Sequence, residues 1–304
     1  MRAPFSSWRA RDALDVCAGE IGSAPELAPA DVWPFDTTMI DAGGSAIAVS
    51  EAGQGPVLLF YTGIGSFIWR DVMVRLSSDF RCITLDPPGI GLSEPVPRAD
   101  TTLRTSSCAL SGVIGALGLT DITLVVHDSA GPPAFAAAAR EPARFRGLVG
   151  VNTFGWRPAG TAFRAMLAVM GSSVTRQFDL LTWGLARLTS TSFGVGRHLD
   201  AASRQAYQAG LQRGMAAFHD YLHDALASDI YAEVTRGMAG PLSALPLLTI
   251  FGERNDPLGF QPQWRALFPR LRQVTIPKGN HFPMCDAPQF VADHIRQWHH
   301  EYVR

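Results

Sequence analysis

Six short apolar segments recur along the chain, and stretches with helical spacing of apolar residues separate them. The segments are VLLFY (57–61), CITLD (82–86), ITLVV (122–126), LVGVN (148–152), LLTIF (247–251) and QVTI (273–276). Segments of this kind, alternating with helices, are typical of parallel strands that are covered on both faces. The pattern therefore predicts an α/β fold, with a mostly parallel central sheet flanked by helices.

Two regions depart from this alternation. Residues 37–51 contain two β-rich runs joined by glycines, which predicts an antiparallel hairpin ahead of the parallel strands. Residues 154–242 show helical periodicity without a convincing strand, and a single crossover helix needs far fewer residues. We therefore expect a core of residues 35–153 and 243–304, with residues 154–242 inserted as a helical cap over the active site.

The first 34 residues are expected to form an N-terminal extension that lies on the core, with a short helix near residues 8–18. Charges stand where a signal peptide needs an apolar stretch, and no apolar run in the sequence is long enough to span a bilayer. These features predict a cytoplasmic protein.

Composition and charge narrow the class of partner. Apolar residues make up 47% of the chain and charged residues 17%, which is enough to bury a large core. The formal net charge is −1 and the arginines are spread along the chain, so we expect a small-molecule partner and neither nucleic acid nor membrane. The four cysteines lie far apart and lack metal-ligand spacing, so neither a metal nor another cofactor is expected.

The first catalytic candidates follow the segment at 122–126, where the chain reads HDSAGP (127–132) before an alanine-rich helix. A strand, a tight turn of small residues and a helix form a nucleophile elbow, in which the nucleophile lies on a strained backbone. Asp128 and Ser129 could each be the nucleophile. Choosing Ser129 would put the bulky His127 where a small residue is needed, so Asp128 is preferred.

Further candidates follow the last two predicted strands. GERNDP (252–257) contains Glu253 and Asp256, and GNHFP (279–283) contains His281. Ligands bind beyond the carboxyl ends of the strands in such sheets, and the chain order nucleophile, acid, base is that of a catalytic triad on this kind of sheet. We therefore predict a triad of Asp128, Asp256 and His281, in which Asp256 orients the ring of His281. Glu253 is the alternative acid on the same loop.

These segments resemble those of the α/β-hydrolase family. LGLTDITLVVHDSAG (117–131) matches the family's LGLxxVxLVGHSxGG without a gap, which puts Asp128 at the nucleophile position, and Asp256 resembles the family's acid position more closely than Glu253 does. The resemblance implies an oxyanion hole made by the backbone N–H of Ser129 and by that of Gly63 or Ile64.

The aspartate at the elbow makes the chain similar to haloalkane dehalogenases and epoxide hydrolases. HDSAGP resembles the dehalogenase elbow HDWGG, and NHFPMCDAP (280–288) resembles the dehalogenase histidine loop. Dehalogenases usually have a tryptophan after the nucleophile and an asparagine in the first loop, whose N–H groups bind the departing halide. This chain has Ser129 and Ile64 there, and it also lacks the HGxP motif of epoxide hydrolases.

The resemblance implies a hydrolase that forms a covalent ester on Asp128, which water activated by His281 then hydrolyses. An ionised carboxylate needs no base to attack an sp³ carbon. The expected partners are a small apolar organic substrate and water, with a haloalkane as substrate or an epoxide whose oxygen a cap tyrosine protonates. Aromatic cap residues are the candidates for substrate binding: Trp156, Trp183, Tyr207 and Tyr221.

Two alternatives stay open. Ser129 as the nucleophile would make the protein a serine esterase or lactonase. The altered oxyanion loop would suit a non-hydrolytic binding protein or a lyase on the same fold, although a pure binding protein has no need of Asp, Asp and His at three strand ends.

Overall fold

The computed structural model describes residues 20–23, 28–256 and 258–303. Their strands form a nine-stranded sheet in the order β1-β2-β3-β5-β4-β6-β7-β8-β9. The strands are β1 (Glu20–Ser23), β2 (Asp36–Asp41), β3 (Ala46–Ala52), β4 (Val57–Thr62), β5 (Arg81–Leu85), β6 (Ile122–His127), β7 (Phe145–Val151), β8 (Leu247–Gly252) and β9 (Arg272–Ile276).

The strand directions confirm the predicted α/β fold. Strands β5, β4, β6, β7, β8 and β9 run parallel, and each of the six apolar segments lies on one of them. Every residue of β6 and β8 is buried, as the continuous apolar runs require. The predicted hairpin is β2 paired antiparallel with β3. Strand β1, which pairs with β2, was not predicted and lies within the expected extension.

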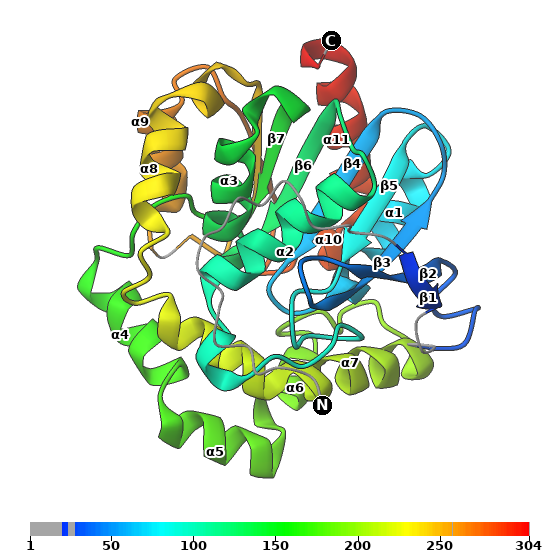
Figure 1. Cartoon of the computed structure of the whole chain (residues 1–304), viewed down its shortest axis with the longest axis vertical. Helices are drawn as coiled ribbons and strands as arrows, with labels where there is room; N and C mark the ends of the chain where they lie inside the picture. The colour runs from blue at the N-terminus through cyan, green and yellow to red at the C-terminus, as the bar shows by residue number, and fades with distance from the viewer. Residues whose placement is uncertain (1–19, 24–27, 257, 304) are drawn as a thin grey trace.

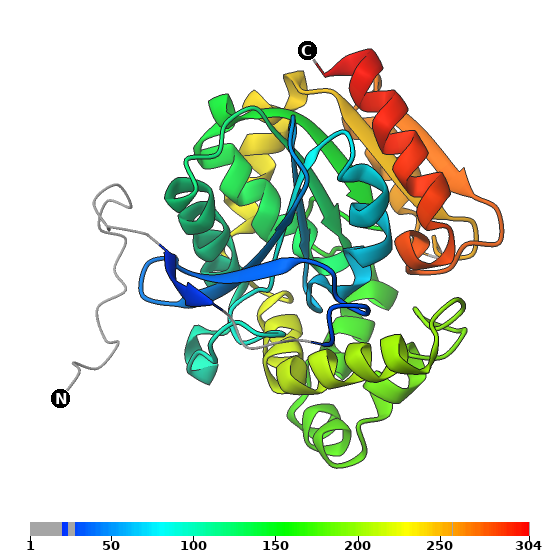
Figure 2. The ribbon, with the colours of Figure 1, turned by 90° about the vertical axis from the view of Figure 1, so that its right-hand side faces the viewer.

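The helices cover both faces of the sheet. They are α1 (Arg70–Leu76), α2 (Leu103–Ala116), α3 (Gly131–Arg140), α4 (Thr161–Met170), α5 (Ser173–Thr182), α6 (Gly184–Thr189), α7 (Ala201–Asp224), α8 (Tyr231–Ala239), α9 (Phe260–Leu267), α10 (Pro283–Asp286) and α11 (Pro288–Tyr302). Helices α1 and α11 pack together on one face, whereas α2, α3 and α8 lie on the other (Figure 2). The helix expected near residues 8–18 lies outside the described residues.

Five helices lie between β7 and β8, where the sequence predicted a helical insertion. Helices α4, α5 and α6 pack on α7, and this group lies at the bottom of the molecule in Figure 1. Helix α8 instead packs on α3, a helix of the core. The inserted helical region is therefore α4–α7, and the predicted span 154–242 also includes a helix that covers the core. None of the helices in the described ranges is long and apolar enough to cross a membrane.

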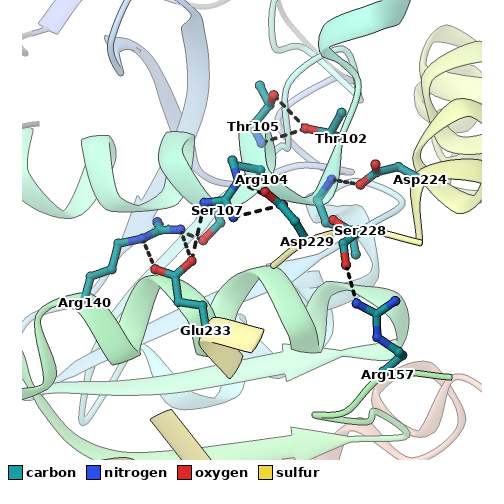
Figure 3. Close-up of polar contacts among 11 residues, drawn as sticks. Thr102, Arg104, Thr105, Ser107, Arg140, Arg157, Asp224, Ser228, Asp229 and Glu233 are labelled. Carbon is teal, nitrogen blue, oxygen red and sulfur yellow. Dashed lines mark hydrogen bonds and ion pairs between the residues drawn. The ribbon is translucent and has the colours of Figure 1, made fainter. Parts of the chain in front are cut away.

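Charged side chains join the end of the insertion to the core (Figure 3). Arg140 of α3 forms two hydrogen bonds with Glu233 of α8, at 2.7 Å and 3.1 Å, and the remaining guanidinium nitrogen donates to Ser107 of α2. The Asp224 carboxylate accepts a hydrogen bond from the backbone N–H of Leu103, the first residue of α2. These contacts hold the C-terminal end of α7 and the N-terminal end of α8 to α2 and α3.

Replacing Glu233 with alanine is expected to lower the free energy of unfolding by about 1–3 kcal/mol, because a partly buried Arg140 then loses its two-point acceptor. Urea unfolding checks this. Asp293→Ala is the matched control, because its ion pair with Arg296 lies on an exposed helix surface, and it should cost less than about 0.5 kcal/mol. Equal losses in the two variants would contradict the structural role of Glu233.

Candidate functional site

The nucleophile elbow lies directly after β6. Asp128 begins a single 3₁₀ turn that leads into α3, and its φ of 52° is in the left-handed region that non-glycine residues rarely adopt. The turn is held by Thr153, whose hydroxyl donates to the Asp128 carbonyl at 2.5 Å. A Cβ on Gly131 would lie 2.2 Å from the carbonyl oxygen of Phe154, so only glycine fits there. The small residues of the predicted elbow thus have a steric cause.

The Asp128 carboxylate faces His281. Its Oδ1 lies 3.7 Å from Nε2 of His281, and about 30% of the Asp128 side chain is exposed. Burial by itself would raise the pKa of Asp128, but the charge of His281 and the backbone N–H of Ser129 act against it and hold the pKa well below its usual range. Asp128 is therefore ionised at neutral pH, which is the state that a carboxylate nucleophile requires.

Ser129 has a different environment from its neighbour. Its side chain is 3% exposed, and its hydroxyl forms no hydrogen bond within the described part of the chain. The hydroxyl lies close to Gly63, where an added Cβ would be only 3.0 Å from it. Both ring nitrogens of the adjacent His127 contact other groups. Ser129 therefore lacks the hydrogen-bonded base that activates a serine nucleophile.

His281 is held through its backbone carbonyl. That oxygen accepts hydrogen bonds from Nδ2 of Asn152 at 2.8 Å and from Nε2 of His127 at 3.0 Å. Asn152 also donates to the carbonyl of Asn280 and accepts from the backbone N–H of Gly252. Its φ of 41° is positive, a conformation that asparagine tolerates better than most residues. Asn152 thus ties the end of β7 to the end of β8 and to the histidine loop.

The state of His127 follows from its partners. Burial, and secondly the charge of His281, lower the pKa of His127 to about 3, so its ring is neutral at pH 7. Its Nε2 contacts a carbonyl, which only accepts, so the proton is on Nε2. Nδ1 is then the acceptor for the hydroxyl of Thr62, 3.4 Å away. Neither His127 nor Asn152 was predicted to be part of the site, although both are polar residues at the ends of apolar segments.

The carboxylate of Asp256 is bound elsewhere in this structure. Its two oxygens accept hydrogen bonds from the backbone N–H groups of Phe260 and Gln261, at the start of α9. Glu253 likewise accepts from the backbone N–H of Lys278. Among the described residues, neither carboxylate forms a hydrogen bond or ion pair with His281. The structure thus brings Asp128 and His281 together but does not place the predicted acid against the histidine ring.

The loop that was predicted to form the oxyanion hole lies beside the elbow. Ile64 lines the same cavity as Asp128 and Ser129, and Gly63 lies behind the Ser129 hydroxyl. Neither Gly63 nor Ile64 donates its backbone N–H to another described residue. Free N–H groups near the nucleophile are what an oxyanion hole requires.

A cavity of about 400 Å³ opens above Asp128 and His281. Its size falls within the usual range for small-molecule sites. The polar residues that line it include Asp128, His281, Asn280 and Arg254. Apolar side chains from the helical insertion form the walls: Phe163, Met166, Leu167, Met170, Leu185, Phe193, Leu211, Phe218 and Leu222.

The four aromatic candidates have different places. Tyr207 lines the cavity, and its hydroxyl donates to Thr189. Tyr221 is not among the described residues that line it, but its hydroxyl donates to the Ser129 carbonyl at 2.6 Å and so supports the elbow. Trp156 packs against Phe260 and Trp264, and Trp183 lies at the junction of α5 and α6. Neither tryptophan is part of the cavity wall within the described ranges.

The low pKa of His127 predicts a pH dependence of stability. The unfolded chain binds a proton at this histidine near pH 6.5, whereas the folded chain binds it only near pH 3. The contribution of His127 to stability is therefore fully present above pH 6.5 and is lost between pH 6.5 and 3, with a slope of up to about 1.4 kcal/mol per pH unit.

Urea unfolding at several pH values between 4 and 8 measures this slope. His127→Gln should reduce it, whereas His223→Gln, at an exposed position of α7, should leave it unchanged. An unchanged slope in the His127 variant would mean that other groups cause the acid sensitivity.

Asn152→Gly is expected to lower the free energy of unfolding by about 2–4 kcal/mol. Glycine accepts the positive φ, so the loss reports the missing side-chain bonds to Gly252, Asn280 and His281. Asn152→Ala should cost about 1 kcal/mol more, because alanine is strained at this φ. Chemical denaturation of both variants checks the prediction, and a loss below about 0.5 kcal/mol for the glycine variant would contradict it.

The chain is similar in sequence to proteins of one known fold family. A family described as alpha/beta hydrolase fold matches residues 55–179. Haloalkane dehalogenase 2 of Mycobacterium tuberculosis is 28% identical over 271 residues, which cover 86% of this chain and 94% of the relative. A cis-3-alkyl-4-alkyloxetan-2-one decarboxylase of Shewanella oneidensis is 33% identical over 287 residues, with 87% and 88% covered.

The fold is also that of solved structures. The structure of an epoxide hydrolase without ligand superposes with a TM-score of 0.75 at 17% identity, and the match covers 88% of this chain and 99% of the other. At this identity the likeness concerns the fold alone. Taken with the full-length relatives, it establishes that the chain belongs to the α/β-hydrolase fold family, as an α/β-fold hydrolase related to haloalkane dehalogenases and epoxide hydrolases.

Proposed function

We propose that the protein hydrolyses a small apolar electrophile, in the manner of a haloalkane dehalogenase, through a covalent ester on Asp128. The observation that carries the proposal is the contrast between two neighbours. The Asp128 carboxylate is ionised, faces the cavity and lies 3.7 Å from His281, whereas the hydroxyl of Ser129 has no base. This contrast favours Asp128 over the serine esterase or lactonase alternative.

The proposed reaction has two steps. An oxygen of Asp128 attacks an sp³ carbon, a C–O bond forms, and the leaving group departs with the electron pair of its own bond. His281 then takes a proton from water as the hydroxyl adds to the ester carbonyl carbon. The tetrahedral oxyanion accepts hydrogen bonds from the backbone N–H of Ser129 and of Gly63 or Ile64. As it collapses, the bond from the carbonyl carbon to the alkyl-bearing oxygen breaks, and the ring of His281 gives its proton to that oxygen, which releases the alcohol. The carboxyl group of Asp128 loses its proton to solvent and is again a carboxylate.

The role of Asp256 in this scheme is to stabilise the protonated ring of His281 during the second step. Because Asp256 is bound at the start of α9 in the structure, this role requires its loop to turn toward the histidine. We further propose that α4–α7 act as the cap, because their side chains form most of the cavity wall and exclude water from the first step.

Few side-chain hydrogen-bond donors are available to the proposed leaving group. The usual tryptophan and asparagine of the dehalogenases are Ser129 and Ile64 here, so the Ser129 hydroxyl is the side-chain donor next to the nucleophile. Tyr207 is the cavity tyrosine that could protonate an epoxide oxygen, since its hydroxyl lies against Thr189 at the cavity wall. Tyr221 is committed to the Ser129 carbonyl and is less suited to that task.

A second candidate reaction comes from the Shewanella relative, which is named for cis-3-alkyl-4-alkyloxetan-2-ones. Asp128 would attack the sp³ ring carbon that is bonded to the ring oxygen. The bond between that carbon and the ring oxygen would break, which gives an ester on Asp128 and a free carboxylate on the neighbouring carbon. Loss of carbon dioxide would then form the carbon–carbon double bond and return the electron pair to Asp128. The products of this route are an alkene and carbon dioxide, and no water is consumed.

Trapping of the ester tests the proposed nucleophile. His281→Ala incubated with 1-bromohexane should accumulate a hexyl ester, which peptide mass spectrometry should locate on Asp128. Asp128→Asn should form no adduct and should lose turnover by about a thousandfold or more. Bromide release, diol formation from styrene oxide and alkene formation from a cis-dialkyl oxetanone distinguish the three substrate classes.

Ser129→Ala is the matched control, because it removes the neighbouring hydroxyl and leaves the carboxylate in place. It should retain activity within about tenfold, which corresponds to the loss of one hydrogen bond. An acyl group on Ser129 after incubation with p-nitrophenyl butyrate, or loss of activity in Ser129→Ala with retention in Asp128→Asn, would overturn the proposal in favour of a serine esterase.

A further inference from the structure

Helix α5 is oriented opposite to an ordinary surface helix. It exposes Val174, Phe178 and Leu181, residues that are 81%, 66% and 82% exposed, and it buries Asp179. The spacing of the three exposed residues puts them on one face of the helix. A surface helix normally turns such an apolar face toward the core and its charged residues toward water.

Polar contacts fix this orientation. The carboxylate of Asp179 lies 3.0 Å from Nε2 of the buried His219 on α7, and it accepts a hydrogen bond from the backbone N–H of Leu185 at 2.8 Å. The other ring nitrogen of His219 donates to the carbonyl of Met170, at the end of α4. These bonds hold α4, α5 and α6 on α7 with the apolar face of α5 turned outward.

Segments next to α5 in the chain also expose large apolar side chains. Ten large apolar residues are exposed in the described part of the chain, and seven of them lie between residues 166 and 193. We call these seven the apolar patch: Met166, Val169, Val174, Phe178, Leu181, Leu188 and Phe193. Figures 1 and 2 both show α5 at the outer edge of the molecule, on the side away from the C-terminus. Single exposed apolar residues are ordinary, but a gathering of this kind marks an interaction surface.

The exposed charged side chains of α4 and α6 are both arginines. Residues 157–199 contain five arginines and the buried Asp179, and two of these arginines, Arg176 and Arg197, pair with aspartates outside this range. Arg164 of α4 and Arg187 of α6 are exposed. The net charge of −1 for the whole chain led to the expectation of no membrane partner, but that value hides this local excess of arginine. Anionic lipid headgroups attract arginines, and an outward apolar face can be buried among the acyl chains beneath the headgroups.

We propose that α4–α6 dock the apolar patch onto the surface of an anionic lipid bilayer, with the helices lying in the interface. Met166 and Phe193 belong to the apolar patch and also line the cavity above Asp128, so the cavity opens toward the docked surface. An apolar molecule dissolved in the lipid would then reach the cavity directly. That last consequence rests on the proposed function, whereas the docking itself does not.

Cosedimentation of the full chain with lipid vesicles tests the docking. The protein should bind vesicles of phosphatidylcholine with phosphatidylglycerol more strongly than vesicles of phosphatidylcholine alone, and added salt should weaken the binding. Phe178→Asp with Leu181→Asp should lower the affinity by at least about tenfold. Arg164→Gln with Arg187→Gln should lower binding to the anionic vesicles by about tenfold and should change binding to neutral vesicles little.

The control is Val74→Asp with Leu267→Asp, which places the same charges at exposed apolar positions outside the apolar patch. It should bind like the unmodified protein, and circular dichroism should show that all variants are folded. Absence of vesicle binding by the unmodified protein, or equal binding by the patch variant and the control, would overturn the proposal. A dimer seen by light scattering that the patch variant abolishes, without vesicle binding, would assign the patch to a second copy instead. None of these measurements uses catalysis, so their outcome is independent of the role of Asp128.

Discussion

The carbonyl oxygen of His281 accepts hydrogen bonds from two neighbouring strand ends, and the geometry of the site depends on this junction. His127 ends β6 and Asn152 follows β7, and both donate to that oxygen. Parallel register makes this possible, because adjacent strands finish at the same edge of the sheet, with His127 level with Val151. Asp128 follows His127 directly, so the carboxylate and the histidine loop are positioned by the same contacts. The neutral ring of His127 can donate to the carbonyl without bringing a buried positive charge next to His281.

Much of the fold could be predicted from the sequence because its cause is local. A run such as ITLVV is apolar at four of its five positions and has no alternation of apolar and polar residues, which suits a strand buried on both faces, and β6 is such a strand. The elbow was predictable for a similar reason, since only small residues fit between Asp128 and the chain at Thr153 and Phe154. Strand β1 carries no such signal, and its place depends on pairing with β2 rather than on its own pattern.

The candidate site was predictable only where sequence position determines spatial position. Asp128 and His281 are close because each follows a parallel strand. The hydrogen bonds of Asp256 to α9, by contrast, depend on the conformation of a loop, which residue spacing does not determine. The cap aromatics show the same limit. Helical periodicity indicates that Tyr207 and Tyr221 share a helix, but only the packing of α7 decides that one lines the cavity and the other reaches the elbow. Helix α5 goes further, because the buried contact between Asp179 and His219 reverses the face that apolar periodicity alone would turn inward.

The bond from Tyr221 to the carbonyl of Ser129 links the two parts of the molecule at the nucleophile itself. A helical insertion of this kind looks like a module that evolution could exchange freely while the sheet stays constant. Here such an exchange would remove the donor for a buried carbonyl in the turn that carries Asp128, unless the incoming helices supplied a hydroxyl at the same place. The insertion and the core are therefore expected to have changed together, and a graft between relatives would have to carry this tyrosine with it.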